Sequence, residues 1–321
     1  MSYAIETFSL TKNYGNGRGC HDVTLRIPAG EAFGFLGPNG AGKSTIVKML
    51  VGLTTPTDGK ALLFGQPAGS VEARRRIGYL PELFRYPGWL SGEEALQFHA
   101  KLCGMKGTSV KSRIDHLLDE VGIGHRGRDR IKGYSKGMQQ RLGLACALLS
   151  DPDIVFLDEP ASALDPVGRH EVRELLQRLR KEGKTIFLNS HLLEDVEQLC
   201  DHVALLNNGR ILADGRVSDV LRASSARWHF RVGGMTPDML DYLREILIAP
   251  VHLLPWQEGE TPAWGEHWLE VELEEDEQVG YFNRLLIEQG ITLYETQKVK
   301  SSLDEWFLQA VSGLEHRGEN R

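Results

Sequence analysis

The segment Phe35–Thr45, FLGPNGAGKST, restricts the fold of this chain more than any other, because three glycines and a lysine directly follow an apolar run. Ala32–Leu36 predicts a buried strand, and Ser44–Val51 has the apolar spacing of a helix start. A glycine-rich loop between them lets successive backbone N–H groups turn toward one anion, at the positive end of the helix dipole. The segment therefore predicts an α/β domain with an anion-binding loop.

This loop fits the pattern G-x-x-x-x-G-K-[ST] from Gly37 to Ser44. In such a loop a lysine supplies a mobile charge for the β and γ phosphates, and a hydroxyl supplies a ligand for Mg²⁺. A glycine-rich turn that binds nothing is the alternative, and many unrelated NTPases share the pattern. We predict that a nucleoside triphosphate is held by the loop residues Gly37, Pro38, Asn39, Gly40, Ala41, Gly42, Lys43, Ser44 and Thr45.

A second apolar run, Ile154–Leu157, ends in two carboxylates, Asp158 and Glu159. In a parallel α/β sheet the carboxyl ends of buried strands face the ligand crevice, so we expect Asp158 beside Mg²⁺. Glu159 is then placed to orient or deprotonate the water that attacks the γ-phosphate. The alternative is a solvated strand end that turns at Pro160.

The segment Gly133–Leu149 predicts a further helix start, because Ser135 is a natural N-cap and an apolar helical face follows it. This start is a second place where an anion could bind, or only a capped helix. Later in the chain the apolar run Ile186–Leu188 precedes His191, which puts this histidine near another strand end.

These motifs have the order and spacing of the nucleotide-binding subunit of ABC transporters, which residues 1–222 resemble. Lys43 and Ser135 are 92 residues apart, Ser135 and Asp158 are 23 apart, and Asp158 and His191 are 33 apart. The resemblance implies the P-loop NTPase fold of ABC-type ATPases, with ATP and Mg²⁺ as ligands. It also implies that the helix start at Ser135 faces the γ-phosphate of ATP bound by a second copy, so that two copies enclose two ATP molecules.

The resemblance assigns roles to individual positions. Tyr14 matches the aromatic residue that stacks on adenine, and Ser135 and Gly137 belong to the turn that faces the γ-phosphate. His191 matches the histidine that reaches the γ-phosphate, and Ser162–Asp165 matches the loop through which the two copies sense each other. The predicted catalytic residues are Glu159, His191 and Lys43.

Two positions depart from the family pattern. The signature turn, usually Leu-Ser-Gly-Gly-Gln, reads Tyr134-Ser135-Lys136-Gly137-Met138. Glu82 stands where a glutamine near Mg²⁺ is common, so the predicted metal ligands are Ser44, Asp158 and Glu82. Both variants resemble exporter-type subunits that pair with a separately encoded permease.

A helical insert is predicted at about residues 83–134, where Ser91–Glu94 has capping-box spacing. In the family such an insert transmits motion to the permease. Phe84, Tyr86 and Trp89 are the residues we expect at this contact, although they could instead pack in the core of the insert.

The composition changes after residue 223. Residues 224–321 carry 18 acidic and 8 basic residues, a net charge of −10, whereas residues 1–223 carry +3. The pattern after residue 222 predicts an accessory α+β domain, 223–321, with the ferredoxin-like order β-α-β-β-α-β and a closing amphipathic helix at 301–313. So acidic a region is a poor partner for nucleic acid.

The leading prediction is an ATPase that dimerises head to tail, with itself or a paralogous subunit, and drives a separate transmembrane permease. No apolar run reaches the roughly 18 residues of a membrane span, and no signal pattern is present, so we expect a cytoplasmic protein held peripherally at the inner face of the membrane through its permease. The alternatives are an ABC-type ATPase acting on ribosomes or DNA and a nucleotide-binding module without turnover. The single phosphate loop and the acidic tail disfavour the first alternative.

Overall fold

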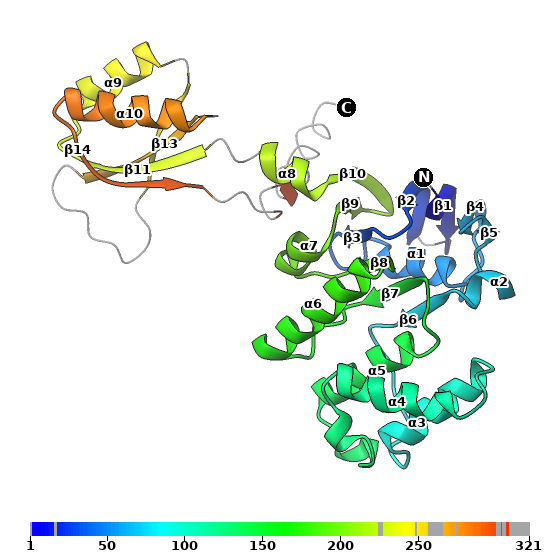
Figure 1. Cartoon of the computed structure of the whole chain (residues 1–321). Helices are drawn as coiled ribbons and strands as arrows, with labels where there is room; N and C mark the ends of the chain where they lie inside the picture. Colours follow the sequence, from blue (N-terminus) through cyan, green and yellow to red (C-terminus); the bar gives the residue numbers. More distant parts are fainter. Residues whose placement is uncertain are drawn as a thin grey trace. The chain divides into compact units, whose positions relative to one another are not determined.

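The computed structural model describes residues 2–15, 18–223, 227–247, 249–255, 266–273, 275–299, 303, 306 and 307. The chain divides into two compact units, Met1–Val217 and Ser218–Arg321 (Figure 1). The boundary expected from the sequence, after residue 222, falls inside helix α8 (Val217–Ala223) and stays a prediction.

The first unit contains a four-stranded antiparallel sheet. Its strand order is β2 (Gly19–Pro28), β1 (Tyr3–Asn13), β4 (Asp58–Leu63) and β5 (Gln66–Pro67). In β2 the residues Val23, Leu25 and Ile27 are buried while their neighbours are more exposed, as the period of a strand with one covered face requires.

A six-stranded sheet forms the centre of the first unit. Its order is β10 (Arg210–Arg216), β9 (His202–Asn207), β3 (Ala32–Leu36), β8 (Thr185–Asn189), β7 (Ile154–Asp158) and β6 (Ile77–Leu80). All neighbours pair in parallel except β10 with β9. Every residue of β3, β7 and β8 is buried, which explains why these strands read as continuous apolar runs.

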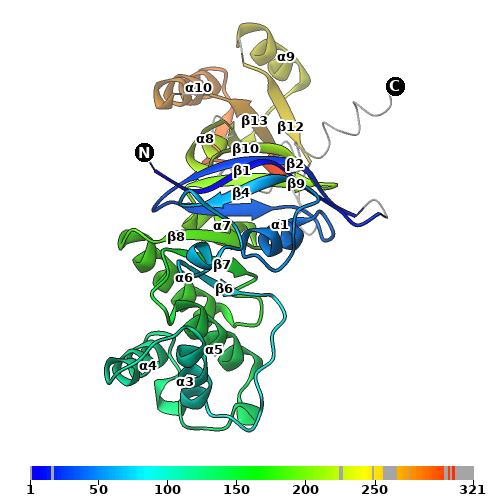
Figure 2. The same cartoon turned by 90° about the vertical axis from the view of Figure 1, so that its right-hand side faces the viewer.

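The six-stranded sheet is covered on both faces (Figure 2). On one side its aromatic residues share a core with α1 (Lys43–Leu50) and with the antiparallel sheet; the ring centroids of Phe33 and Phe156 each lie 5.4 Å from that of Phe187. On the other side lie α6 (Pro166–Lys181) and α7 (Leu193–Leu199). A Cβ on Gly34 would lie 2.3 Å from the Val196 side chain, so α7 packs directly on β3.

A helical part follows the short helix α2 (Val71–Arg74) and strand β6. It consists of α3 (Gly92–Leu102), α4 (Ser109–Glu120), η1 (Gly124–Arg126), η2 (Ile131–Gly133) and α5 (Lys136–Leu148). The predicted capping box at α3 is confirmed: the Glu94 N–H donates to Ser91 Oγ at 3.1 Å, and the Ser91 N–H donates to the Glu94 carboxylate at 2.7 Å.

After α8 the second unit follows the order β-α-β-β-α-β. Its elements are β11 (Arg227–Gly233), α9 (Pro237–Ile246), β12 (Val251–Leu254), β13 (Glu266–Glu272), α10 (Asp276–Glu288) and β14 (Thr292–Lys298). The antiparallel sheet runs β12-β13-β11-β14, which agrees with the expected ferredoxin-like arrangement. Phe230 and Phe282 join sheet and helix with ring centroids 4.6 Å apart. Most of the predicted helix at 301–313 lies outside the described residues.

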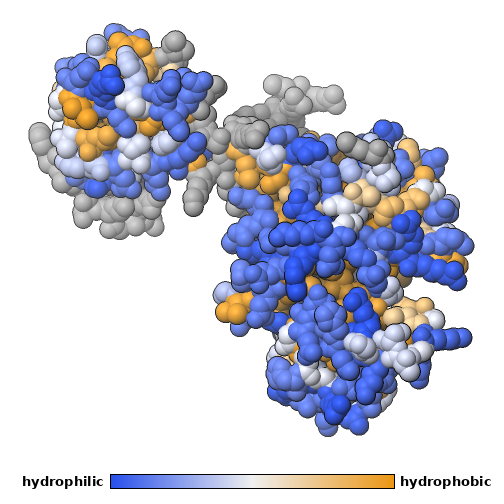
Figure 3. All heavy atoms as spheres, in the orientation of Figure 1, coloured by the Kyte–Doolittle hydropathy of each residue, from blue (hydrophilic) through white to orange (hydrophobic). Residues whose placement is uncertain are grey.

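Hydrophilic side chains dominate the face of the first unit seen in Figure 3. Within the described ranges, no helix combines the length and the apolar character needed to cross a bilayer. All four cysteines are free thiols: Cys20, Cys103, Cys146 and Cys200.

Candidate nucleotide-binding site

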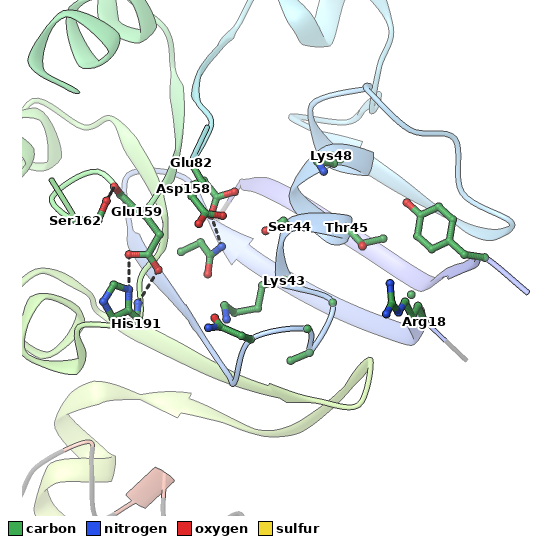
Figure 4. Close-up of a pocket in the computed structure, with 17 residues that line it drawn as sticks. Arg18, Lys43, Ser44, Thr45, Lys48, Glu82, Asp158, Glu159, Ser162 and His191 are labelled. Carbon is green, nitrogen blue, oxygen red and sulfur yellow. Dashed lines mark hydrogen bonds and ion pairs between the residues drawn. The ribbon is translucent and has the colours of Figure 1, made fainter. Parts of the chain in front are cut away.

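A cavity of about 1100 Å³ opens where β3, β7 and β8 end and α1 begins (Figure 4). Parallel strands bring their carboxyl ends to one edge of the sheet, so motifs far apart in the sequence meet there. Most of the predicted site residues line this cavity: Tyr14, Asn39, Gly40, Ala41, Gly42, Lys43, Ser44, Thr45, Glu82, Asp158, Glu159 and His191.

The loop before α1 requires its glycines. Gly37 and Gly42 have φ values of 150° and 106°, which L side chains rarely adopt. A Cβ on Gly37 would lie 2.2 Å from the Leu206 carbonyl oxygen, and one on Gly42 would lie 2.4 Å from the Gly19 carbonyl oxygen. Gly42 also supplies no side-chain cap to α1, so no capping side chain competes with a bound anion at the start of the helix.

Lys43 lies folded against its own loop. Its ammonium donates to the carbonyl oxygens of Gly37 at 2.6 Å and Pro38 at 3.2 Å. Gly37 and Pro38 were predicted to bind the nucleotide, but neither lines the cavity; they contact Lys43 instead. Burial lowers the pKa of Lys43, and the carboxylates of Glu159, Asp158 and Glu82 oppose this shift. The buried cation therefore has acidic groups nearby and no anion in direct contact within the part of the chain that the structure describes.

Two carboxylates stand side by side at the end of β7 and after β6. Asp158 is only 3% exposed, and the side chain of Glu82 lies next to it (Figure 4). Burial raises the pKa of Asp158, hydrogen bonds from Asn189 and Ser44 oppose the rise, and the charges of Glu82 and Glu159 add to it. Carboxylates held this close favour a cation between or beside them, and Ser44 adds a hydroxyl oxygen.

Glu159 is held by His191. The His191 backbone N–H donates to Glu159 Oε1 at 2.9 Å, and its ring Nδ1 lies 2.7 Å from Oε2. Facing a carboxylate, Nδ1 carries the proton and donates it. Glu159 also has a φ of 55°, an uncommon value for a residue with a side chain. Glu159 and His191, two of the three predicted catalytic residues, thus form one hydrogen-bonded unit.

The far end of the cavity suits an aromatic base. The Tyr14 side chain is 50% exposed, and the Lys12 ammonium lies 5.4 Å from the centre of its ring. Arg18 and Lys48 line the cavity on the same side as the loop and add positive charge, as Figure 4 shows.

Ser135 and Gly137 do not line this cavity. Ser135 caps α5, where its side chain accepts a hydrogen bond from the Met138 N–H at 3.2 Å. Gly137 packs against Leu164 of the loop before α6, since an added Cβ would lie 3.2 Å from that side chain. The predicted signature turn is therefore a structured helix start outside the cavity of its own chain.

Sequence reasoning missed several residues at the site: Arg18, Gly19, Lys48, Asn189 and, in this role, Ser162. Asn189 is the last residue of β8, one position after the apolar run that marked the strand, so the strand end itself was the available signal. Gln140 of α5 was also missed; its amide donates to the backbone carbonyl of Glu159 at 3.0 Å. Single basic residues such as Arg18 and Lys48 carry no pattern that distinguishes them from surface charges.

Comparisons with known proteins identify relatives of this chain. The family model described as ABC transporter matches residues 20–162. The bacitracin transport ATP-binding protein BcrA of Bacillus licheniformis is 33% identical over 98% of this chain and 99% of its own length. An ABC transporter ATP-binding protein of Synechocystis is 41% identical over 68% of this chain, a match that spans 64% of the relative's length.

The fold is shared with solved structures as well. A structure of an ATP binding subunit of an ABC transporter is 32% identical and superposes with a TM-score of 0.63, over 68% of this chain and 92% of the other. The phosphate loop and the carboxylates Asp158 and Glu159 lie within the residues that the family model matches. This chain belongs to the family of ABC transporter ATP-binding proteins.

Proposed function

We propose that this chain is the ATP-hydrolysing subunit of an ABC transporter. ATP drives head-to-tail dimerisation of two ATPase subunits, and the dimer moves a substrate through a separate transmembrane permease, which holds the subunits at the inner face of the membrane. The observation that carries the proposal is the convergence of a phosphate loop, a pair of carboxylates and the Glu159–His191 unit in one cavity of about 1100 Å³.

The loop suits a triphosphate. Gly37 and Gly42 leave no room for a side chain at their positions, and α1 starts without a side-chain cap. Lys43 now donates to two neutral carbonyl oxygens of its own loop. Phosphate oxygens would offer it charge-assisted hydrogen bonds, which are roughly twice as strong as neutral ones.

The donor set suits Mg²⁺. Ser44, Asp158 and Glu82 present hydroxyl and carboxylate oxygens to the same part of the cavity, and Mg²⁺ prefers oxygen ligands. Mg²⁺ bound there would neutralise charge on the phosphate oxygens. The substitution of glutamate for the common glutamine at position 82 places a second carboxylate beside Asp158, which favours the charged ion over an empty site.

Glu159 is suited to accept a proton. His191 engages both of its carboxylate oxygens, and this fixes the direction of the carboxylate. Each ionised oxygen retains acceptor capacity, so a water molecule can still donate to it. The neutral His191 ring leaves Nε2 as an acceptor, and the protonated ring makes it a donor toward an anion.

The signature turn supports a second copy. Ser135 and Gly137 border no part of the cavity of their own chain, so they can meet nucleotide only from outside it. The Ser135 hydroxyl accepts from the Met138 N–H and keeps its own proton to donate to a phosphate. Lys136, in place of the usual glycine, adds a positive charge to the same turn.

A groove on the helical part supports a permease contact. It has a volume of about 700 Å³ and is lined by residues of the segment after β6 and by α3 and α5. The ring centroids of Phe84 and Tyr86 lie 5.5 Å apart, whereas Trp89, which also lines the groove, is 72% exposed. Two of the three rings therefore pack within the helical part, and the exposed Trp89 is available to a partner. The name of the Bacillus licheniformis relative, a bacitracin transport protein, is consistent with a role in transport.

The test uses Glu159→Gln, which keeps the shape of the side chain and removes the base. Because a general base contributes about 10²–10⁴-fold, we expect ATP hydrolysis to fall by about this factor while nucleotide binding persists. Analytical ultracentrifugation with ATP and Mg²⁺ should then detect a stable dimer. Glu72→Gln, an exposed position on α2, makes the same charge change and should behave as the unaltered chain. A variant that binds ATP and sediments only as a monomer would contradict the shared site.

A further inference from the structure

Asn189 occupies the centre of the site without an assigned role. It is the last residue of β8, and the parallel register places it opposite Asp158 on β7 and Phe35 on β3. It is 2% exposed and lines the nucleotide cavity. Its position between the strand that leads into the phosphate loop and the strand that carries Asp158 follows from the sheet order and not from any sequence motif.

The orientation of the Asn189 amide is set by Asp158. Its Nδ2 donates to Asp158 Oδ1 at 2.5 Å, while Asp158 also accepts a hydrogen bond from Ser44. The opposite orientation would bring the amide oxygen against a carboxylate oxygen, so Oδ1 must point away from Asp158.

This leaves a buried acceptor without a donor. Among the residues that the structure describes, no group donates to Asn189 Oδ1, although the atom is shielded from solvent. A buried unpaired polar atom costs about 1–3 kcal/mol, so its persistence beside a ligand cavity points to a donor that arrives with the ligand.

The chemistry of the surroundings restricts that donor. Asp158, Glu82 and Glu159 are acceptors when ionised, and the Lys43 ammonium is engaged with its own loop. Phosphate oxygens are acceptors too. A water molecule bound to Mg²⁺ is a strong donor, and Mg²⁺ usually keeps several of its waters.

We propose that Asn189 is a positioning residue for the metal: Nδ2 holds the Asp158 carboxylate, and Oδ1 accepts a hydrogen bond from a water in the Mg²⁺ shell. The inference rests on the proposed ATP–Mg²⁺ site and adds to it a residue that orients both the metal carboxylate and the hydration of the ion. Partners of this kind behind metal ligands typically change metal affinity by about 10–100-fold.

The test is Asn189→Leu in the full chain, which preserves side-chain size and removes both polar atoms. A fluorescent ATP analogue is titrated in the presence of Mg²⁺ and in the presence of EDTA, and the ratio of the two dissociation constants gives the metal-dependent gain in affinity. We expect this gain to fall by about tenfold or more, with the affinity in EDTA unchanged. Asn189→Ser, whose side chain is too short for both contacts, should lose the same metal-dependent gain. It replaces the leucine variant if that variant does not fold.

Two controls separate the outcomes. Thr185→Val removes another buried hydrogen bond of β8, the one that Thr185 Oγ1 accepts from the Gly30 N–H at 2.9 Å, and should lower thermal stability without changing the gain. Asp158→Asn should abolish most of the gain. If Asp158→Asn loses the gain and both Asn189 variants keep it, the role of Asn189 is wrong and the proposed function stands. If the unaltered chain shows no metal-dependent gain, the proposed metal site itself is wrong.

Discussion

The helices α1 and α5 both begin behind a short turn, yet their first turns differ in one respect. α1 follows Gly42, which has no side chain to cap it, whereas α5 follows Ser135, whose oxygen accepts from the Met138 N–H. The first helix start leaves its donors for an external anion, and the second satisfies one of its own. A helix start thus indicates an anion site when glycine, and not a capping side chain, precedes the helix.

The two helix starts also differ in whether they border the nucleotide cavity of their own chain. Lys43, Asp158 and Glu82 border the cavity at α1, and Ser135 borders none of it. The site at α1 is therefore assembled within one chain. The proposed role of Ser135 requires a second chain, which makes the two helix starts separable by experiment.

Among the tests of this comparison, the largest effect is expected from removing the cation at α1. Lys43→Ala should lower ATP hydrolysis by about 10²–10³-fold and weaken nucleotide binding, because no other side chain is placed in the loop to supply this charge. Steady-state hydrolysis and nucleotide titration measure both effects. Lys111→Ala, an exposed lysine on α4, is the matched control. Unchanged turnover in Lys43→Ala would remove the main contrast between the two helix starts.

A smaller effect of a different kind is expected at α5. Ser135→Ala removes the cap and should lower the free energy of unfolding by about 1 kcal/mol. Nucleotide affinity, measured at chain concentrations where the protein is monomeric, should stay the same, while ATP-dependent dimerisation weakens. A loss of nucleotide affinity in the monomer would mean that this helix start belongs to the site of its own chain.

The smallest effect concerns the charge beside α1. Burial raises the pKa of Asp158, so above the unfolded pKa of 3.8 the folded chain binds more protons at this group than the unfolded chain does. Stability from this group therefore falls as the pH rises through the folded pKa. Asp158→Asn should raise the melting temperature of the nucleotide-free protein by a few degrees near neutral pH, and this gain should disappear in acid. Thermal unfolding across pH measures it, and a pH-independent difference would contradict the electrostatic cause.

Local patterns predicted the parts of the site that lie on one segment. The glycine spacing around Lys43, the carboxylates after β7 and the Ser91–Glu94 capping box each depend on residues a few positions apart. Such patterns survive in the sequence because backbone geometry or helix capping restricts which residue types can occupy them.

Direct hydrogen bonds between residues that meet only through the sheet were not predicted. Asn189 and Asp158 are 31 residues apart, and their hydrogen bond exists because β7 and β8 pair in parallel with these two positions in register. The approach of Glu159 to His191 over 32 residues depends on the same pairing. The roles of Arg18 and Lys48 likewise depend on where the neighbouring strand and helix turn toward the cavity.

By itself the sequence determined that this protein has a phosphate loop between a strand and a helix, acidic residues at a second strand end, and an acidic region after residue 223. The tertiary structure alone decided which side chains share the cavity, which helix start beside it has no side-chain cap, and which buried amide oxygen has no donor among the described residues. The physical reason is that strand register and layer packing set distances between segments, whereas residue type and spacing constrain only the backbone of one segment.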